Sequence, residues 1–154
     1  MRTRLLRLLI TLGMLISINC AKAQQTFIEP ITEQTMVGQK LGVQVGYESP
    51  LGYEIGAFYQ QASSMLITGE NADMPRFYEQ EFIGAFFAGT LWSGHNCDIK
   101  LNVRTGATNR ANFTITPSVM GSYKLSRSMK LQCGVGMRNL RPTLRLGLRL
   151  SVFK

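Results

Sequence analysis

The segment "WSGHNCD" at 92–98 holds the residues of this chain best suited to catalysis or metal binding. Ser93, Asp98 and the single histidine, His95, are the residue types of a hydrolytic triad. Triad members, however, must be brought together from separate elements, whereas Ser, Gly and Asn in so short a segment are typical of a tight turn. His95 and Cys97 provide two ligands where zinc normally takes four. We therefore expect no catalytic residue, no cofactor site and no metal site, and we interpret the chain as a non-enzymatic protein.

A second group of polar residues alternates with apolar ones along extended stretches. We expect these side chains to share the interior of a barrel, where charges are desolvated and must pair or form hydrogen bonds. Bases exceed acids in the group, so some arginines must bond neutral side chains or trapped water. We favour a packed plug that keeps the barrel rigid, because side chains just fill an eight-stranded barrel, over an anion-favouring path. The group comprises Glu48, Glu54, Lys100, Arg104, Arg138, Arg145 and Arg149, and the neutral candidates are Gln44, Gln60, Asn102 and Gln132.

β-Strands are the elements that position these residues. The closing stretch "TLRLGLRLSVFK" places leucines on one face and Arg145, Arg149 and Phe153 on the other. The turns "SPLG", "SGHN", "ATNRAN", "SRS" and "NLRP" separate such stretches, and only 62–79 forms a long connection. The stretch 80–92 is apolar on both faces, so its pattern does not define an inner face. Seven strands are predicted, over 40–48, 52–61, 80–92, 99–106, 113–125, 129–138 and 143–154.

The N-terminus carries an export signal. A basic start, the apolar run "LLITLGMLISI" and "AKA" at 21–23 predict a signal peptide over 1–23, leaving 24–154 as one domain. Residues 24–97 hold eight carboxylates against two cations, whereas residues 98–154 hold eleven Lys or Arg against one carboxylate. Export argues against a nucleic-acid partner for this basic half. Cys97 and Cys133 could form a disulfide after export, and the sequence leaves this open.

Three features predict that the apolar face meets lipid rather than a soluble core. The polar face is rich in Gly, Ser, Thr, Asn and Gln and carries few charges, which suits a crowded lumen better than a solvated surface. Strands of about nine to eleven residues are long enough to cross a bilayer at a tilt. Aromatic residues gather at strand ends, as in an interfacial girdle; they are Tyr47, Tyr53, Tyr59, Tyr78, Trp92, Phe113 and Tyr123.

The lengths of the connections predict how the strands run. In membrane barrels the tight turns and both chain ends lie on the periplasmic side, and the long loops lie outside. Counting back from the C-terminus places "SPLG", "SGHN" and "SRS" on the periplasmic side and the 62–79 loop outside. This count requires an eighth strand at 27–37, despite its weak pattern and Pro30. We therefore expect an all-β, antiparallel up-and-down barrel of eight strands, with a bulge at Pro117.

The export signal with "AKAQ" and the amphipathic last strand give the chain a resemblance to the small bacterial outer-membrane barrels of the OmpA-domain and OmpX type, over about 26–154. That resemblance implies a porin-like Gram-negative outer-membrane protein, in contact with lipid and monomeric, with a structural or surface-interaction role. A protein partner would bind the 62–79 loop. Two alternatives stay open: a soluble periplasmic barrel with an apolar ligand inside 144–152, and a narrow anion-favouring channel.

Overall fold

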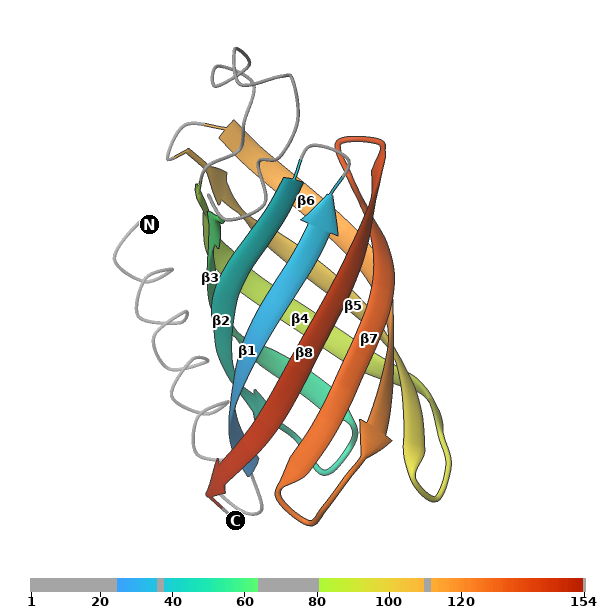
Figure 1. Ribbon diagram of the computed structural model, residues 1–154. Coiled ribbons are helices and arrows are strands. Elements are labelled where there is room, and N and C mark those ends of the chain that lie inside the picture. Colours follow the sequence, from blue (N-terminus) through green and yellow to red (C-terminus); the bar gives the residue numbers. More distant parts are fainter. Residues whose placement is uncertain (1–24, 36–37, 64–80, 110–111, 154) are drawn as a thin grey trace, which may run out of the picture.

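The computed structural model describes residues 25–35, 38–63, 81–109 and 112–153, and the regular elements in these ranges are all strands (Figure 1). They form a closed barrel in which every strand pairs antiparallel with its neighbours in sequence and β1 closes against β8. This confirms the predicted eight-stranded up-and-down barrel. The strands are β1 (Gln25–Thr35), β2 (Gly38–Glu48), β3 (Tyr53–Ala62), β4 (Glu81–Ser93), β5 (Cys97–Thr108), β6 (Asn112–Lys124), β7 (Met129–Arg138) and β8 (Arg141–Phe153).

β1 is the strand that the sequence pattern predicts least clearly. It begins and ends two residues before the predicted 27–37 and pairs with β2 along its whole length, from Gln25 opposite Glu48 to Thr35 opposite Gly38. On its other side it pairs with β8 and so removes the free sheet edge that seven strands would leave. The other strands begin and end within two residues of their predicted bounds. No helix among the described residues is long and apolar enough to span a lipid bilayer.

The leucines of β8 face the outside of the barrel. Leu144 and Leu146 are each 45% exposed, whereas Arg145 and Arg149 on the opposite face are 1% exposed. Outward apolar and inward polar side chains also alternate along much of the other strands, although the inner faces of β1 and β4 carry apolar side chains as well. The expectation of an apolar ligand inside 144–152 is therefore wrong, because these leucines line the outer surface and the interior beside them is ionic.

Pro117 does not produce the bulge that the sequence predicts. It lies opposite Val103 in an unbroken β5–β6 register, and the β6–β7 pairing begins only at the next residue, Ser118. The proline thus occupies a position where β6 has a strand partner on one side only, so a residue without an N–H is accommodated there. Pro30 is placed similarly, because the β1–β8 pairing is interrupted between Ile28 and Ile31 while the β1–β2 pairing continues.

The connections alternate between two ends of the barrel, as their lengths predict (Figure 1). One end, called the terminal end here, holds the start of β1, the end of β8 and the β2–β3, β4–β5 and β6–β7 turns. The opposite end, called the loop end, holds the end of β1, the start of β2 and the β7–β8 turn. The β7–β8 turn at the loop end has Asn139 and Leu140 at φ values of 49° and 63°, the left-handed pair typical of a type I′ hairpin.

The outward aromatic residues are concentrated at the terminal end. Tyr47, Tyr53, Trp92 and Tyr123 are each about half exposed and lie at strand ends beside the three turns there. Tyr59 lies further along β3, and Phe113 lies at the loop end on β6. Tyr78 falls outside the described residues. In the described part of the chain, the predicted girdle is therefore better developed at the terminal end than at the loop end.

Two further points of the sequence analysis concern the face of Phe153 and a possible disulfide between Cys97 and Cys133. The register between β1 and β8 shifts near the end of β8, where Thr26 lies opposite Phe153 and Phe27 opposite Ser151. The prediction for the face of the Phe153 side chain lies outside the described part of the structure. Cys97 and Cys133 are both free thiols, on β5 and β7 with β6 between them.

Candidate functional site

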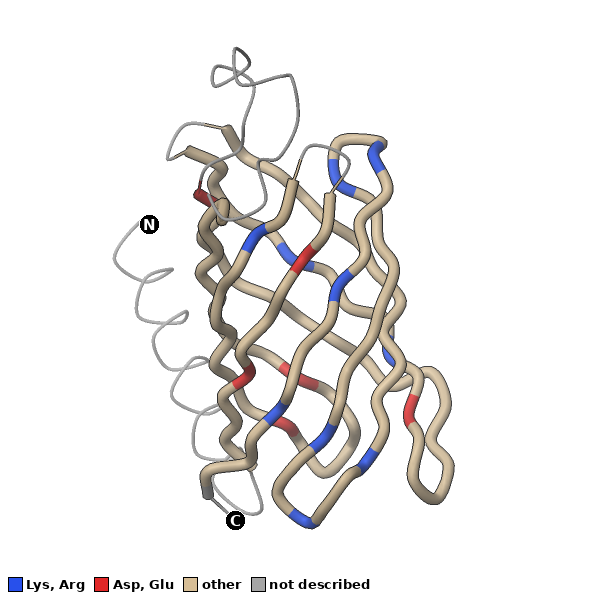
Figure 2. The backbone as a smooth tube through the Cα atoms, viewed as in Figure 1, with Lys and Arg blue, Asp and Glu red and all other residues tan. Residues whose placement is uncertain are grey.

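The interior of the barrel brings the predicted polar group together. Six of its seven members are buried, each at most 3% exposed, and the seventh, Glu48, is partly buried near the terminal end. The ion-paired carboxylates come from β1, β2 and β3, and the cations that bind them come from β5, β7 and β8 (Figure 2). The pairs therefore join residues between 46 and 120 positions apart in the sequence. The acidic first half of the chain meets its basic second half inside the barrel.

One ionic network lies towards the loop end and centres on Glu33 of β1. Its carboxylate, which is 0% exposed, accepts hydrogen bonds from Arg104 at 2.8 Å and from Arg138 at 3.0 Å. Gln60 donates to the same carboxylate at 2.9 Å and accepts from Arg104 at 3.0 Å. Arg138 also donates to the Thr116 hydroxyl at 3.3 Å. We call Glu33, Gln60, Arg104 and Arg138 the loop-end network.

A second network fills the half of the lumen nearer the terminal end. Glu29 accepts from Arg145 at 2.8 Å and from Arg149 at 3.1 Å, and Glu54 accepts from Arg149 at 2.7 Å and is also paired with Lys100. Lys100 is bonded to Glu48 as well, at 2.9 Å. The terminal-end network comprises Glu29, Glu48, Glu54, Lys100, Lys130, Arg145 and Arg149.

Neutral side chains complete this second network in the way a desolvated charge requires. Gln44 accepts from Arg145 at 2.7 Å. Gln132, with its amide oxygen directed at Arg149, accepts from that guanidinium at 2.8 Å and donates to Glu29 at 3.1 Å. Asn102 differs, because its buried amide oxygen has no hydrogen-bond partner.

Four phenylalanines occupy the same interior as the charges. Phe27 packs against Phe86 with ring centroids 6.1 Å apart, and Phe58 packs against Phe82 at 4.6 Å. The Arg149 guanidinium lies 3.7 Å from the Phe27 ring centroid, and that of Arg138 lies 4.2 Å from the Phe82 centroid. Such contacts are attractive because a ring face carries negative electrostatic potential. The attraction is stronger where water is excluded. The rings therefore belong to the ionic plug and do not form a separate apolar core.

Glycines on the inner face make room for these large side chains. A Cβ on Gly46 would lie 2.7 Å from the Phe86 ring and 3.0 Å from the Phe27 ring. A Cβ on Gly56 would lie 2.6 Å from both Phe86 and the Cα of Gly46. The glycine-rich polar face thus has a steric cause, because the space that side chains would take in β2 and β3 is filled by rings from β1 and β4.

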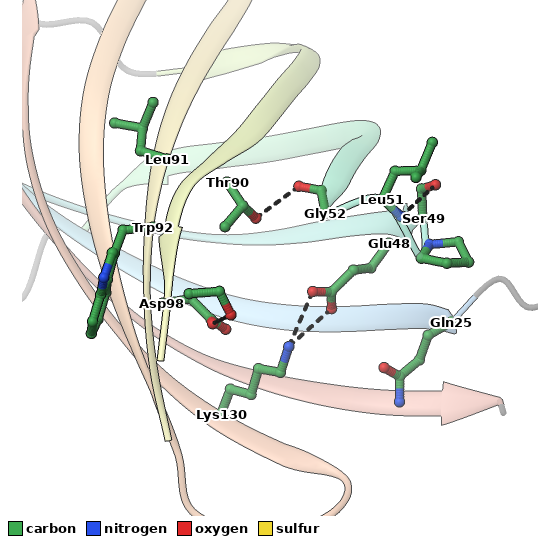
Figure 3. Close-up of a pocket in the computed structure, with 12 residues that line it drawn as sticks. Gln25, Glu48, Ser49, Leu51, Gly52, Thr90, Leu91, Trp92, Asp98 and Lys130 are labelled. Carbon is green, nitrogen blue, oxygen red and sulfur yellow. Dashed lines mark hydrogen bonds and ion pairs between the residues drawn. The ribbon is translucent and has the colours of Figure 1, made fainter. Parts of the chain in front are cut away.

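A pocket of about 710 Å³ opens at the terminal end (Figure 3). Its wall includes the β2–β3 turn, residues 90–93 of β4, Asp98 and the Glu48–Lys130 ion pair at 3.1 Å. Thr90 donates to the Gly52 carbonyl at 2.8 Å and joins the two sides of the wall. The pocket mixes apolar and charged groups, and the Glu48–Lys130 pair of the terminal-end network forms part of its wall.

The segment "WSGHNCD" forms the end of β4, a turn and the start of β5. Ser93 donates its hydroxyl hydrogen to Asp98 at 2.7 Å, and Asp98 also accepts from Ser122 at 3.4 Å. His95 is exposed in the turn. The serine proton is therefore directed at a carboxylate and not at an imidazole, which differs from the order of a hydrolytic triad. Within the described ranges, no group of three or more His, Cys, Asp or Glu is placed to hold a metal ion.

Sequence reasoning missed two of the most connected residues, Glu29 and Glu33. Both are 0% exposed, and between them they bind four arginines. Their spacing of four residues places them on one face of a strand, and this signal was available once β1 was required. The buried Lys40 and the partly buried Lys130 also lie on the inner face and were not in the predicted group.

Comparisons with known proteins agree on the fold. No family model matches the chain, and no curated protein matches its sequence. A de novo designed transmembrane β-barrel, TMB2.3, solved in solution by NMR, superposes with a TM-score of 0.65 at 12% identity, covering 87% of this chain and 99% of the design. A structure from the de novo design of transmembrane β-barrels gives 0.62 at 11% identity, covering 83% and 95%. The fold is that of designed transmembrane β-barrels. Neisserial surface protein A matches over 84% of this chain and 96% of its own, at 12% identity with a TM-score of 0.38.

Proposed function

We propose that this protein is a non-enzymatic outer-membrane β-barrel with a structural or surface-interaction role. The observation that carries the proposal is the continuous apolar outer surface. Every strand presents at least one large apolar side chain outwards, for example Ile28 of β1 at 39% exposed and Ile55 of β3 at 62%. Soluble monomers rarely expose so much contiguous apolar surface, whereas a barrel in lipid requires it.

The interior supports the same proposal. Closed barrels satisfy every backbone group without a free edge, which is the condition for crossing a bilayer with strands. Ionic groups are then acceptable only on the lumen side, where they can pair with one another. The two networks place them there. The plug joins strands on opposite sides of the barrel, such as β1 and β5 through Glu33 and Arg104, and so opposes collapse or shear of the wall.

The outer membrane is the proposed location because the predicted signal peptide of residues 1–23 would export the chain. The terminal end would face the periplasm, since it holds the tight turns and both ends of the barrel. We expect a monomer in contact with outer-membrane lipid. A protein partner would meet the 62–79 connection at the opposite, loop end.

A conducting channel is the weaker alternative. A path for anions needs hydrated space along the lumen, yet Arg104, Arg145 and Arg149 are each at most 1% exposed. Ion pairs also cross the lumen at two levels. These contacts favour a plug, and planar-bilayer recordings of the wild-type protein should show no steady conductance.

The test is the solvent that the folded barrel requires. The mature chain, 24–154, should stay in solution and keep its β-structure in detergent micelles and should insert into lipid vesicles. Trp92, the single tryptophan, is 55% exposed beside the terminal end, so its fluorescence should shift to the blue on insertion. A stable monomer in plain buffer, with no spectral change on adding vesicles, would overturn the proposal.

A matched pair of variants makes the test specific. Leu146→Asp places a carboxylate among the outward apolar side chains and should reduce insertion into vesicles, because a charge in hydrocarbon is costly. Leu140→Asp changes an 89% exposed leucine in the β7–β8 turn and should insert as the wild type does.

A further inference from the structure

The terminal-end network of the lumen contains more positive than negative groups among the described residues. In the loop-end network, the Glu33 carboxylate accepts from both Arg104 and Arg138. In the terminal-end network, two lysines and two arginines share three carboxylates. A buried charge without a counterion is strongly unfavourable, so this excess calls for additional negative charge nearby.

Among the described residues, the unsatisfied hydrogen-bond donors of the lumen lie on one arginine from each network and on Gln44. Arg104 has no partner for Nε and Nη2, and Arg145 has none for Nε and Nη1, although both residues are at most 1% exposed. Gln44, which is bonded to Arg145 through its oxygen, has a buried and unpartnered Nε2. The one unpartnered acceptor found with them is the Asn102 oxygen. Five donor atoms therefore stand against one acceptor.

The strand register brings the two arginines to the same part of the lumen. Arg104 reaches from β5 across the barrel to the carboxylate of Glu33 on β1. Arg145 on β8 is the direct register partner of Glu33, and its side chain leads from there to Glu29. The stem of Arg145 thus begins beside the group that Arg104 binds, so two cationic side chains enter the same part of the lumen.

We propose that a single chloride ion is bound between Arg104 and Arg145. Chloride accepts several hydrogen bonds at once, so it can take the free Nε and Nη hydrogens of both arginines. Water could accept from these donors but would bring no negative charge to the two guanidinium groups. A larger oxyanion is disfavoured because the surrounding side chains leave neither arginine accessible to solvent. The ion would link the two networks and neutralise the excess charge of the terminal-end network.

This inference goes beyond the proposed function, since it depends on the closed barrel and its interior and not on what surrounds the apolar outer surface. It also differs from a conducting path. The chloride is held by buried donors and is part of the folded structure, so its effect should be on stability and not on current.

The test is the chloride dependence of unfolding. The mature barrel in detergent micelles is unfolded with urea in sodium chloride or in sodium gluconate at the same ionic strength, with Trp92 fluorescence as the signal. For the wild type, the unfolding equilibrium constant should fall up to about tenfold for each tenfold rise in chloride above its dissociation constant. Gluconate, which is much larger than chloride, should have no such effect.

Two substitutions separate a bound ion from a general effect of salt. Arg145→Gln removes the proposed site and should abolish the difference between chloride and gluconate. Arg127→Gln removes an exposed arginine from the β6–β7 turn and should leave the difference unchanged. Equal midpoints for the wild type in the two salts would overturn the proposal, as would an undiminished chloride effect in Arg145→Gln.

If Arg145→Gln does not refold, crystals of the wild type grown with bromide in place of chloride decide the question. An anomalous peak within hydrogen-bonding distance of both Arg104 and Arg145 supports the site. Water density there without an anomalous signal, or bromide at the protein surface alone, refutes it.

Discussion

Replacing Glu33 with glutamine removes a carboxylate that pairs with both Arg104 and Arg138. The amide has nearly the same shape, so the substitution leaves no cavity and isolates the effect of charge. Glu33 is 0% exposed, and its bonds of 2.8 Å and 3.0 Å to two buried guanidinium groups cannot be replaced by water without opening the plug. Removing one partner of a buried ion pair costs about 3–5 kcal/mol. A domain with a total stability of about 5–15 kcal/mol would lose a large part of it.

The assay for Glu33→Gln is equilibrium unfolding in urea, in lipid vesicles, followed by Trp92 fluorescence. Glu48→Gln is the matched control, because Glu48 also pairs with cations, namely Lys100, Lys130 and Arg149, but lies near the terminal end with a side chain that is 15% exposed. Water can compensate part of the loss there, so we expect a clearly smaller decrease in the free energy of unfolding. A loss of unfolding free energy below about 1 kcal/mol in Glu33→Gln, which is the scale of an exposed ion pair, would show that the plug is not tightly coupled.

Three further predictions follow from the wall of the barrel. Gly56→Ala should lower the free energy of unfolding by about 1–3 kcal/mol through overpacking against Phe86. Gly121→Ala, whose Cβ would meet its nearest atom at 3.7 Å, should be tolerated. Equal effects of the two substitutions in urea unfolding would contradict the packing described. Leu146→Arg should cost about 2–4 kcal/mol in vesicles if this leucine meets the centre of the bilayer, and a cost near zero would place it elsewhere. Cys97 and Cys133 should each take one maleimide after unfolding without reductant, as measured by mass spectrometry, and a chain that reacts only after reduction would show that they are bridged.

Most of the fold could be predicted from the sequence because its strands alternate clearly. The closing strand is the best case: its leucines and arginines occupy opposite faces, as they do in the structure. The eighth strand could be inferred only from the count of connections. Its own pattern is weak because Phe27 and Ile31 lie on the inner face with Glu29 and Glu33, so the inner face is half apolar.

β4 shows a second limit of the alternation rule. Phe82 and Phe86 face the lumen while Ile83 and Phe87 face outwards, so both faces of the strand are apolar and hydropathy alone gives no phase. The inward rings are stable there because arginines from other strands lie over two of the four phenylalanines at about 4 Å. Such contacts form between residues distant in sequence, so a pattern read along one strand cannot contain them.

The closed barrel explains why carboxylates and cations are unevenly distributed along the sequence. Carboxylates dominate residues 24–97 and cations dominate residues 98–154. In a barrel closed by its first and last strands, the two halves form opposite walls, and their charges meet across the lumen. Which residues pair could not be predicted, because that depends on the stagger of the strands and on side chains long enough to cross.

The most direct test of whether this protein is an outer-membrane barrel is fractionation of the native protein. Cells that make the full chain are separated into periplasm, inner membrane and outer membrane, and the protein is followed by an antibody against its purified form. We predict that it sediments with the outer membrane and stays there through a carbonate wash. Recovery as a soluble monomer in the periplasm would contradict the membrane barrel described above.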